Sequence, residues 1–372
     1  MNPRKPPDFW LFTLTVALLV IGVFMVFDAS YARAGQEKMT GGDSLYFMKR
    51  QVLFALPGLA MMFLAMQIRY WKFRHFGRIL LLLAITGLAL VLVPGVGETV
   101  NGATRWIRIG SIQVQPSEFA KVCLVIYLAA ALSAKKQEVR DWKHGLLPLA
   151  IPVGLVAILT VKEDLGTAVV LVTTALVMVY MAGAKKRHFA VALGMCGLLG
   201  AIAIIIEPYR LNRIIAFIDP FKDYYGSGYQ VCQSLIALGS GGVFGVGLCE
   251  GKEKLFYLPA EHTDFILAVL GEEAGLIGTS LIVVLFLLLA ARGFHIAYHT
   301  KEPFGRLLAA GLTALICGQA LLNVCVVTSS LPATGVPLPF ISYGGSSLVM
   351  NLICVGILLG VSRHPGPIKD YQ

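Results

Sequence analysis

The stretch "EHTDFILAVLGEEAGLIGTSLIVVLFLLLAARG", Glu261 to Gly293, decides the class of fold. A polar cluster at 261–264 runs directly into an apolar segment, 265–291. An apolar run of about 18 residues or more can cross the hydrocarbon core of a bilayer as a helix. Ionisable groups inside a bilayer are costly, and Glu272 and Glu273 lie within this one. The stretch therefore predicts a membrane helix with polar groups at its mouth and in its body.

The whole chain repeats this apolar pattern. It has 372 residues, of which 57% are hydrophobic and 14% charged, and its mean hydropathy is +0.75. We predict an all-α, polytopic membrane protein: one transmembrane domain, 1–372, with the extracytoplasmic loop 207–263 as its main insertion. The ten predicted spans are roughly 9–27, 52–67, 77–94, 116–134, 146–161, 165–182, 189–206, 265–291, 306–328 and 341–361.

Basic residues predict the orientation. The six segments that an N-terminus inside the cell would leave on the cytoplasmic side hold 18 of the 31 Lys and Arg residues. Both termini are therefore expected in the cytoplasm, and the protein in the bacterial cytoplasmic membrane. The net charge of +10 then reflects topology and affinity for anionic headgroups. Nucleic acid is excluded as a partner because the chain has no basic domain.

Long loops lie only on the predicted outer side. They include 95–115 and 207–263, and loops of such length usually carry function. Within the larger loop, 229–239 has helical apolar spacing and is expected to form an amphipathic helix on the membrane surface, while Arg210 and Arg213 suit phosphates. The inner loops are too short for a nucleotide-binding domain and contain no GxxxxGK[ST] motif, so no nucleotide is expected.

Neither cysteine nor histidine forms a metal-ligand pattern. The seven cysteines include no CxxC, and of the seven histidines only His262 is expected to face outward. Cys232 and Cys249 share the outer loop, where a disulfide and two free thiols are both open interpretations.

Several ionisable residues lie within or between the apolar spans. Glu118 and Lys121 are three residues apart, so on a helix they share a face and can pair, either as a structural ion pair or in the wall of a cavity. Asp164 precedes a predicted helix, where it either caps the helix or belongs to a site. Glu272 and Glu273 lie beside Gly271 and Gly275, which favours close helix packing.

Asp264 lies at the predicted outer end of its membrane span. One interpretation is a helix N-cap; the other is a proton acceptor kept ionised by the helix N-terminus, which is expected to lower its pKa and make it a weak base. The Pro- and Gly-rich segment 331–351 cannot be helical throughout. Irregular backbone near a membrane is tolerated where it lines a wet cavity, so this segment is expected to form a cavity wall.

Together these motifs resemble the SEDS family of bacterial cell-wall proteins (shape, elongation, division and sporulation), and the division branch more than the elongation branch. The resemblance runs in order over nearly the whole chain. The matching stretches are "NGATRWIRIGSIQVQPSEFAK", "EDLGTA", "GSGYQVCQSLIALGSGGVFGVGL", "LPAEHTDFILAVLGEE" and "PLPFISYGGSS". The chain departs from the family pattern at Glu261 and Glu163, beside but not at the two aspartates.

The resemblance implies a peptidoglycan glycosyltransferase that polymerises lipid II at the outer leaflet, with Asp264 as the catalytic base. It implies a site that contacts lipid II and the growing lipid-linked glycan, a class B penicillin-binding protein (transpeptidase) and other divisome or elongasome proteins as partners, and at most a divalent cation (Mg or Mn) as cofactor. The candidate substrate-binding residues are Arg105, Trp106, Glu118, Lys121, Asp164, Arg210, Arg213, Gln233, His262 and Ser342.

Two other functions fit some of the same features. A lipid II flippase would also need membrane-embedded charges and a polar cavity, but it needs access from both leaflets, whereas the long loops lie on one side. A scaffold that only holds partner proteins would have no need of Asp264.

Overall fold

The computed structural model describes residues 6–36, 40–100, 103–110 and 112–364. Within these ranges, nine helical segments are long and apolar enough to cross a membrane, and α6 is a shorter apolar helix of 17 residues. The ten predicted spans are therefore present. They are α1 (Phe9–Gln36), α2 (Tyr46–Gln67), α3 (Trp71–Val91), α4 (Pro116–Lys135), α5 (Leu147–Glu163, preceded by η2, Lys136–Arg140, and η3, Trp142–Leu146), α6 (Leu165–Met181), α7 (Lys186–Ile206), α10 (Ile266–His299), α11 (Pro303–Val327) and α12 (Gly345–Ser362).

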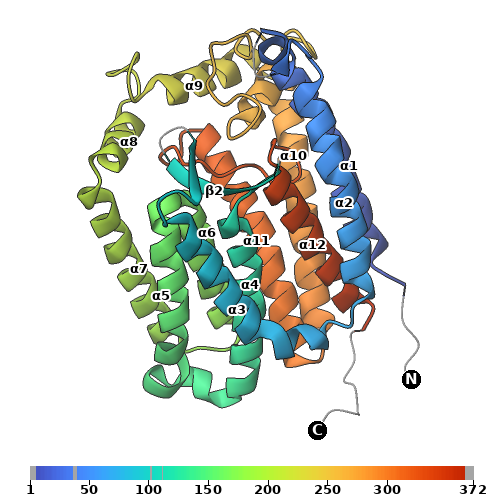
Figure 1. Ribbon diagram of the computed structural model, residues 1–372, viewed down its shortest axis with the longest axis vertical. Coiled ribbons are helices and arrows are strands. Elements are labelled where there is room, and N and C mark those ends of the chain that lie inside the picture. Colours follow the sequence, from blue (N-terminus) through green and yellow to red (C-terminus); the bar gives the residue numbers. More distant parts are fainter. Residues whose placement is uncertain (1–5, 37–39, 101–102, 111, 365–372) are drawn as a thin grey trace.

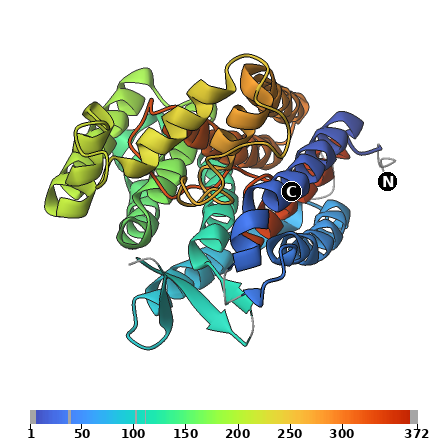
Figure 2. The same ribbon diagram turned by 90° about the horizontal axis from the view of Figure 1, so that it is seen from above.

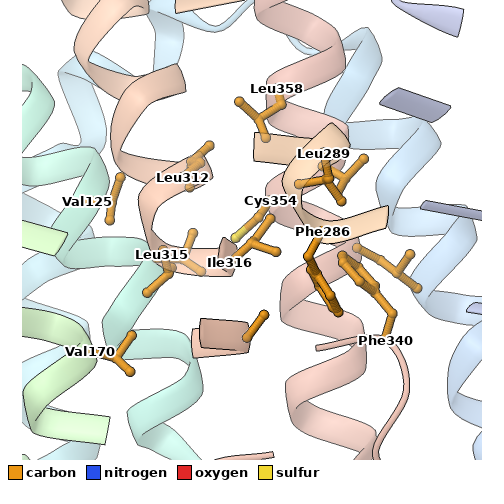
Figure 3. Close-up of a cluster of buried hydrophobic side chains, with 14 of the residues drawn as sticks. Val125, Val170, Phe286, Leu289, Leu312, Leu315, Ile316, Phe340, Cys354 and Leu358 are labelled. Atoms are coloured by element: carbon orange, nitrogen blue, oxygen red, sulfur yellow. The ribbon is translucent and has the colours of Figure 1, made fainter. Parts of the chain in front are cut away.

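Helix α11 runs through the middle of the bundle. Its side chains Leu312, Leu315 and Ile316 lie between α4 and α6 on one side and α10 and α12 on the other (Figure 3). Most of the residues of α4, α11 and α12 are buried. Polar side chains on these inner helices must therefore find partners within the protein.

Helix α7 occupies the opposite extreme. None of its residues is buried, and it lies at the edge of the bundle, where it packs mainly against α6 and α8 (Pro208–Ile218) (Figure 1). Its apolar side chains are thus left for lipid, as expected for the hydrophobic surface of a membrane helix.

The two ends of the described chain meet at one end of the bundle. The backbone N–H of Asp8 donates to Ser362 Oγ at 3.2 Å, and the Asp8 carboxylate pairs with Arg292 near the end of α10. An even number of crossings requires this arrangement. At the other end lie the strands, α8, α9 (Tyr229–Gly241) and the segments 242–265 and 331–344; we call this end the loop face (Figure 1).

The loop face contains elements that hydropathy did not reveal. Loop 95–115 forms an antiparallel sheet, β1 (Gly97–Val100), β2 (Ala103–Ile109) and β3 (Ile112–Val114), which projects to one side in Figure 2. Residues 229–241 form the expected helix α9, but it does not simply lie on the membrane surface. One of its faces, with Val231 and Ala237, is buried and packs against α10 and α11.

Helix α10 is broken at Gly275, whose φ of 63° is unfavourable for a residue with a side chain. Backbone from segment 242–247 enters the break. The N–H groups of Val246 and Gly247 donate to the carbonyls of Glu272 and Glu273, and Gly242 and Val243 accept from the next turn of α10. The backbone groups that the break frees are thereby satisfied, as burial requires.

The paired carboxylates of α10 hold the same region of the loop face. Glu272 accepts from the backbone N–H groups of Lys252 and Glu253, and Glu273 accepts from that of Cys249. Lys254 Nζ lies 2.5 Å from a carboxylate oxygen of both Glu273 and Asp28 of α1. These two acids are therefore structural, in agreement with the packing interpretation. Both Cys232 and Cys249 are free thiols here.

Candidate functional site

Asp264 lies in the turn immediately before α10. The N-cap position belongs to Phe265, and no side chain makes a capping bond there, so the N-cap interpretation of Asp264 is wrong. Its main-chain carbonyl is held instead, by Asn323 Nδ2 of α11 at 2.8 Å. As a whole residue, Asp264 is intermediate in burial.

Four charged or titratable groups from four parts of the chain surround this carboxylate. Burial, followed by the negative charge of Asp164, raises the pKa of Asp264 to about 6, while Arg105, Arg213 and His262 limit the rise. From the sequence we expected the helix N-terminus to lower this pKa, which is the opposite direction. That expectation was wrong because the helix N-terminus does not bind the carboxylate, whereas protein atoms crowd it and a second carboxylate lies nearby.

Arg105 reaches the site from an irregular strand. Glu98 of β1 pairs with Trp106, and Thr99 pairs with Thr104, so Arg105 is the extra residue of a β-bulge. Bulges redirect a side chain and often occur beside active sites. The irregularity explains how Arg105 can face the bundle from an exposed sheet.

Asp164 has a second task besides its charge. It is the N-cap of α6: Oδ1 accepts from the N–H of Gly166 at 2.9 Å, and Oδ2 accepts from the Thr167 hydroxyl at 2.7 Å. The capping interpretation is confirmed, and these bonds keep a buried carboxylate in place.

The irregular segment 331–344 brings the pieces together. A methyl group on Gly335 would lie 3.0 Å from Arg105 Nη1 and 3.7 Å from Asp264 Oδ2. One on Gly166 would overlap Val336 and Thr334 of the same segment, at 2.5 and 2.8 Å. The segment thus packs against the first turn of α6 and forms a wall beside Asp264, as expected.

This contact predicts the effect of Gly335→Ala. The added methyl group meets the end of a flexible Arg105 side chain rather than backbone, so we expect the protein to fold and Arg105 to be displaced. A small misplacement near a reacting centre can cost about 10²-fold in rate. Activity should therefore fall by about 10- to 100-fold with little change in melting temperature. The matched control is Gly318→Ala in α11, where nothing lies within 4 Å of the new methyl group. Equal activities of the two variants would contradict this.

Ser342 and His262 shape the turn that carries Asp264. The Ser342 hydroxyl donates to the carbonyl of Thr263 at 2.5 Å and accepts from the N–H of Leu338. His262 is nearly buried, its ring 4.5 Å from that of Phe47, and its Nδ1 lies 3.3 Å from Glu261 Oε1. Both candidates therefore adjoin the site, and the Ser342 hydroxyl is already engaged.

Glu118 and Lys121 form the predicted pair, with 2.8 Å between Oε1 and Nζ and both side chains nearly inaccessible. Lys121 also donates to Gln319 Oε1 at 2.6 Å, and Gln319 Nε2 donates to the carbonyl of Pro337. The charges are thus satisfied inside the protein and linked to segment 331–344. This favours the structural interpretation.

The other candidates lie in different settings. Arg213 of α8 donates to the carbonyl of Ala333 at 2.8 Å and stacks over Tyr209, on the Asp264 side of α8. Arg210 instead donates to the carbonyls of Ala203 and Val161, at the ends of α7 and α5. Trp106 is a partly exposed residue of β2, and Gln233 is buried in α9; neither is among the groups that act on Asp264.

An open cavity of about 270 Å³ adjoins Arg213 on the loop face. Its wall is formed by Tyr209, Asn212, Arg213, Gly226, Ser227, Tyr229, Gln230, Pro259 and Ala333. Among the described residues, no group of three or more His, Cys, Asp or Glu side chains is arranged to hold a metal ion. Asp164 and Asp264 are the two carboxylates that interact at the site, and a divalent cation there stays a prediction.

Sequence reasoning missed two side chains on α11, Gln319 and Asn323. Both are buried, and both donate to the backbone of segment 331–344. Their spacing of four residues places them on one face of an apolar span, a signal that could have been read from the sequence.

The comparisons with known proteins find relatives over nearly the whole chain. The family model for the cell cycle proteins FtsW, RodA and SpoVE matches residues 9–366. The stage V sporulation protein E of Bacillus subtilis is 43% identical over 97% of this chain and 98% of its own length. A probable peptidoglycan glycosyltransferase FtsW of Geobacter sulfurreducens is 43% identical over 96% of this chain and 95% of its own.

Solved structures share the fold. A chain from a peptidoglycan synthase complex, described as coordinating polymerization and crosslinking, superposes with a TM-score of 0.79 at 30% identity, over 96% of this chain and 98% of its own. The rod shape determining protein RodA of Thermus thermophilus gives 0.71 at 27% identity, over 97% and 98%.

The site and the fold are those of a polytopic membrane protein with a carboxylate centre on its loop face. The chain belongs to the FtsW/RodA/SpoVE family. The similarity to proteins named FtsW and SpoVE confirms the resemblance to the division branch.

Proposed function

We propose that this protein is a peptidoglycan glycosyltransferase that polymerises lipid II into glycan strands, with Asp264 as the catalytic base. The observation that carries the proposal is the setting of Asp264, a half-buried residue whose carboxylate interacts with Asp164, Arg105 and Arg213. Peptidoglycan glycosyltransferase is also the activity in the names of its FtsW relatives.

The reaction needs one base and a place for negative charge. The 4-hydroxyl oxygen of the acceptor sugar forms a bond with the anomeric carbon of the donor, and its proton passes to Asp264. The bond from the anomeric carbon to the lipid pyrophosphate breaks, and its electron pair leaves with the pyrophosphate. General bases work best with a pKa near the working pH, and a pKa of about 6 suits Asp264 better than that of an exposed aspartate.

The cationic side chains suit the leaving group. Arg105 and Arg213 act on the same carboxylate from β2 and α8, so they border the space where the pyrophosphate departs. Fixed positive groups stabilise charge that develops in a transition state. Because the pyrophosphate is already activated, the reaction requires no nucleotide.

The orientation and partner follow from separate features. Basic residues are concentrated on the side opposite the loop face, which supports an extracytoplasmic site and cytoplasmic termini. A similar chain was solved within a peptidoglycan synthase complex, which supports a class B transpeptidase as partner.

The test is polymerisation in detergent micelles. Purified protein, with and without its cognate transpeptidase, is given lipid II, and the products are separated on a gel. A flippase has no leaflets to connect in a micelle, and a scaffold has no chemistry to perform. Glycan polymer that is sensitive to a muramidase is the expected result. Unchanged lipid II in both samples would contradict the proposal.

A further inference from the structure

Asn323 of α11 joins two segments that are distant in sequence. Its single side-chain amide donates to the carbonyl of Asp264 at 2.8 Å and to that of Val336 at 2.9 Å. The side chain is 1% exposed, so water cannot replace it in these bonds. Both hydrogens of the amide are used, because a primary amide has two donors.

The orientation of this amide is determined by its partners. Both neighbours are carbonyl oxygens, which can only accept, so the nitrogen must face them. The other atom, Oδ1, is buried and finds no partner among the described residues. The hydrogen bonds of the Asn323 side chain to the described residues are therefore the two that link the turn before α10 with segment 331–344.

Those two segments carry the parts of the site. One holds Asp264, and the other holds Gly335, where an added methyl group would lie 3.0 Å from Arg105 Nη1 and 3.7 Å from Asp264 Oδ2. Val336 packs against Gly166, in the turn that Asp164 caps. One amide thus connects the carboxylate to the wall on which its charged neighbours depend.

We propose that Asn323 is a positioning residue: its amide fixes the Asp264 turn to segment 331–344, and so sets where the Asp264 carboxylate lies relative to Arg105 and Asp164. This inference rests on the proposed function. Asn323 touches neither the substrate nor the reacting atoms, and acts through Asp264.

The test is Asn323→Leu, which keeps the approximate size and removes both donors. Without the two hydrogen bonds from Asn323, the Asp264 carboxylate moves and water reaches it. We expect kcat to fall by about 10- to 100-fold with KM little changed. In a plot of kcat against pH, the low-pH part of the curve, where activity rises as Asp264 loses its proton, is the acid limb. This acid limb should also move to lower pH, because hydration favours the charged form of Asp264. The groups that face Asp264, and so set this limb, are Arg105 of β2, Asp164 before α6, Arg213 of α8 and His262 of the same turn.

The matched control is Asn351→Leu in α12. Asn351 is also buried, but it donates only to Ser347 within its own helix. It should keep wild-type kcat and an unmoved acid limb. Equal losses in the two variants, or a slow Asn323→Leu protein with an unmoved limb, would mean that only bundle packing was affected and would overturn the proposal.

Asn323→Ser covers the case in which the leucine variant does not fold. Serine retains one donor and occupies less space, so an intermediate kcat and a smaller limb shift are expected. Wild-type kcat and limb in either folded variant would overturn the role. If neither the wild-type protein nor Asn351→Leu makes polymer, the proposed function is contradicted. If both make polymer and Asn323→Leu also has wild-type activity, only the inference about Asn323 is contradicted.

Discussion

Asp264→Asn protein should form almost no glycan polymer from lipid II. Asparagine has the size of aspartate but cannot accept the proton, and general-base catalysis typically contributes about 10²- to 10⁴-fold. The fold should tolerate the change, because Asn323 binds the main-chain carbonyl and the side chain does not cap α10. The measurement is the initial rate of polymerisation, with protein amount and transpeptidase binding matched to wild type.

The control for this substitution is Asp141→Asn. Asp141 caps the short helix η3 at the end opposite the loop face and is exposed. Asparagine also caps well, so this variant should polymerise normally. Wild-type rates from Asp264→Asn would remove the carboxylate from the mechanism.

Lys121→Met should cause the largest loss of stability. It leaves Glu118 as a buried, unpaired charge, and breaking a buried ion pair in this way typically costs about 3–5 kcal/mol. We expect a clearly lower melting temperature and a lower yield. In the double variant Glu118→Gln/Lys121→Met no charge is stranded, so most of the stability should return.

The same series separates structure from chemistry. If the Glu118–Lys121 pair is structural, the folded double variant should polymerise lipid II at a rate near that of wild type. If Lys121 instead acted on the substrate, Lys121→Met would melt normally and lose polymerisation, and the double variant would remain inactive. That second pattern would contradict the structural assignment.

The local sequence pattern was enough to predict the features that depend on residues close together in the chain. Apolar runs identified the spans, the spacing of Glu118 and Lys121 identified their pairing, and the position of Asp164 identified its cap. Each of these is determined within one helix or at its end.

The remaining features depend on contacts between distant segments. The break at Gly275 lies within a continuous apolar run and is stabilised by backbone from 242–247. The pKa of Asp264 depends on Asp164 and Arg105, which helix periodicity cannot place beside it. Asn323 appears in sequence as a polar residue in a span, and only the fold shows which carbonyls it binds.

The pH dependence of kcat/KM tests the role of Asp264 most directly, since it reports the ionisation of the free enzyme. A base must be deprotonated, so activity should rise with pH through an acid limb near the Asp264 pKa of about 6. Asp164→Asn keeps the cap but removes the negative charge that raises this pKa, so its limb should move to lower pH. A wild-type rate that stays constant down to the range of an exposed aspartate, or a limb that Asp164→Asn does not move, would contradict the account.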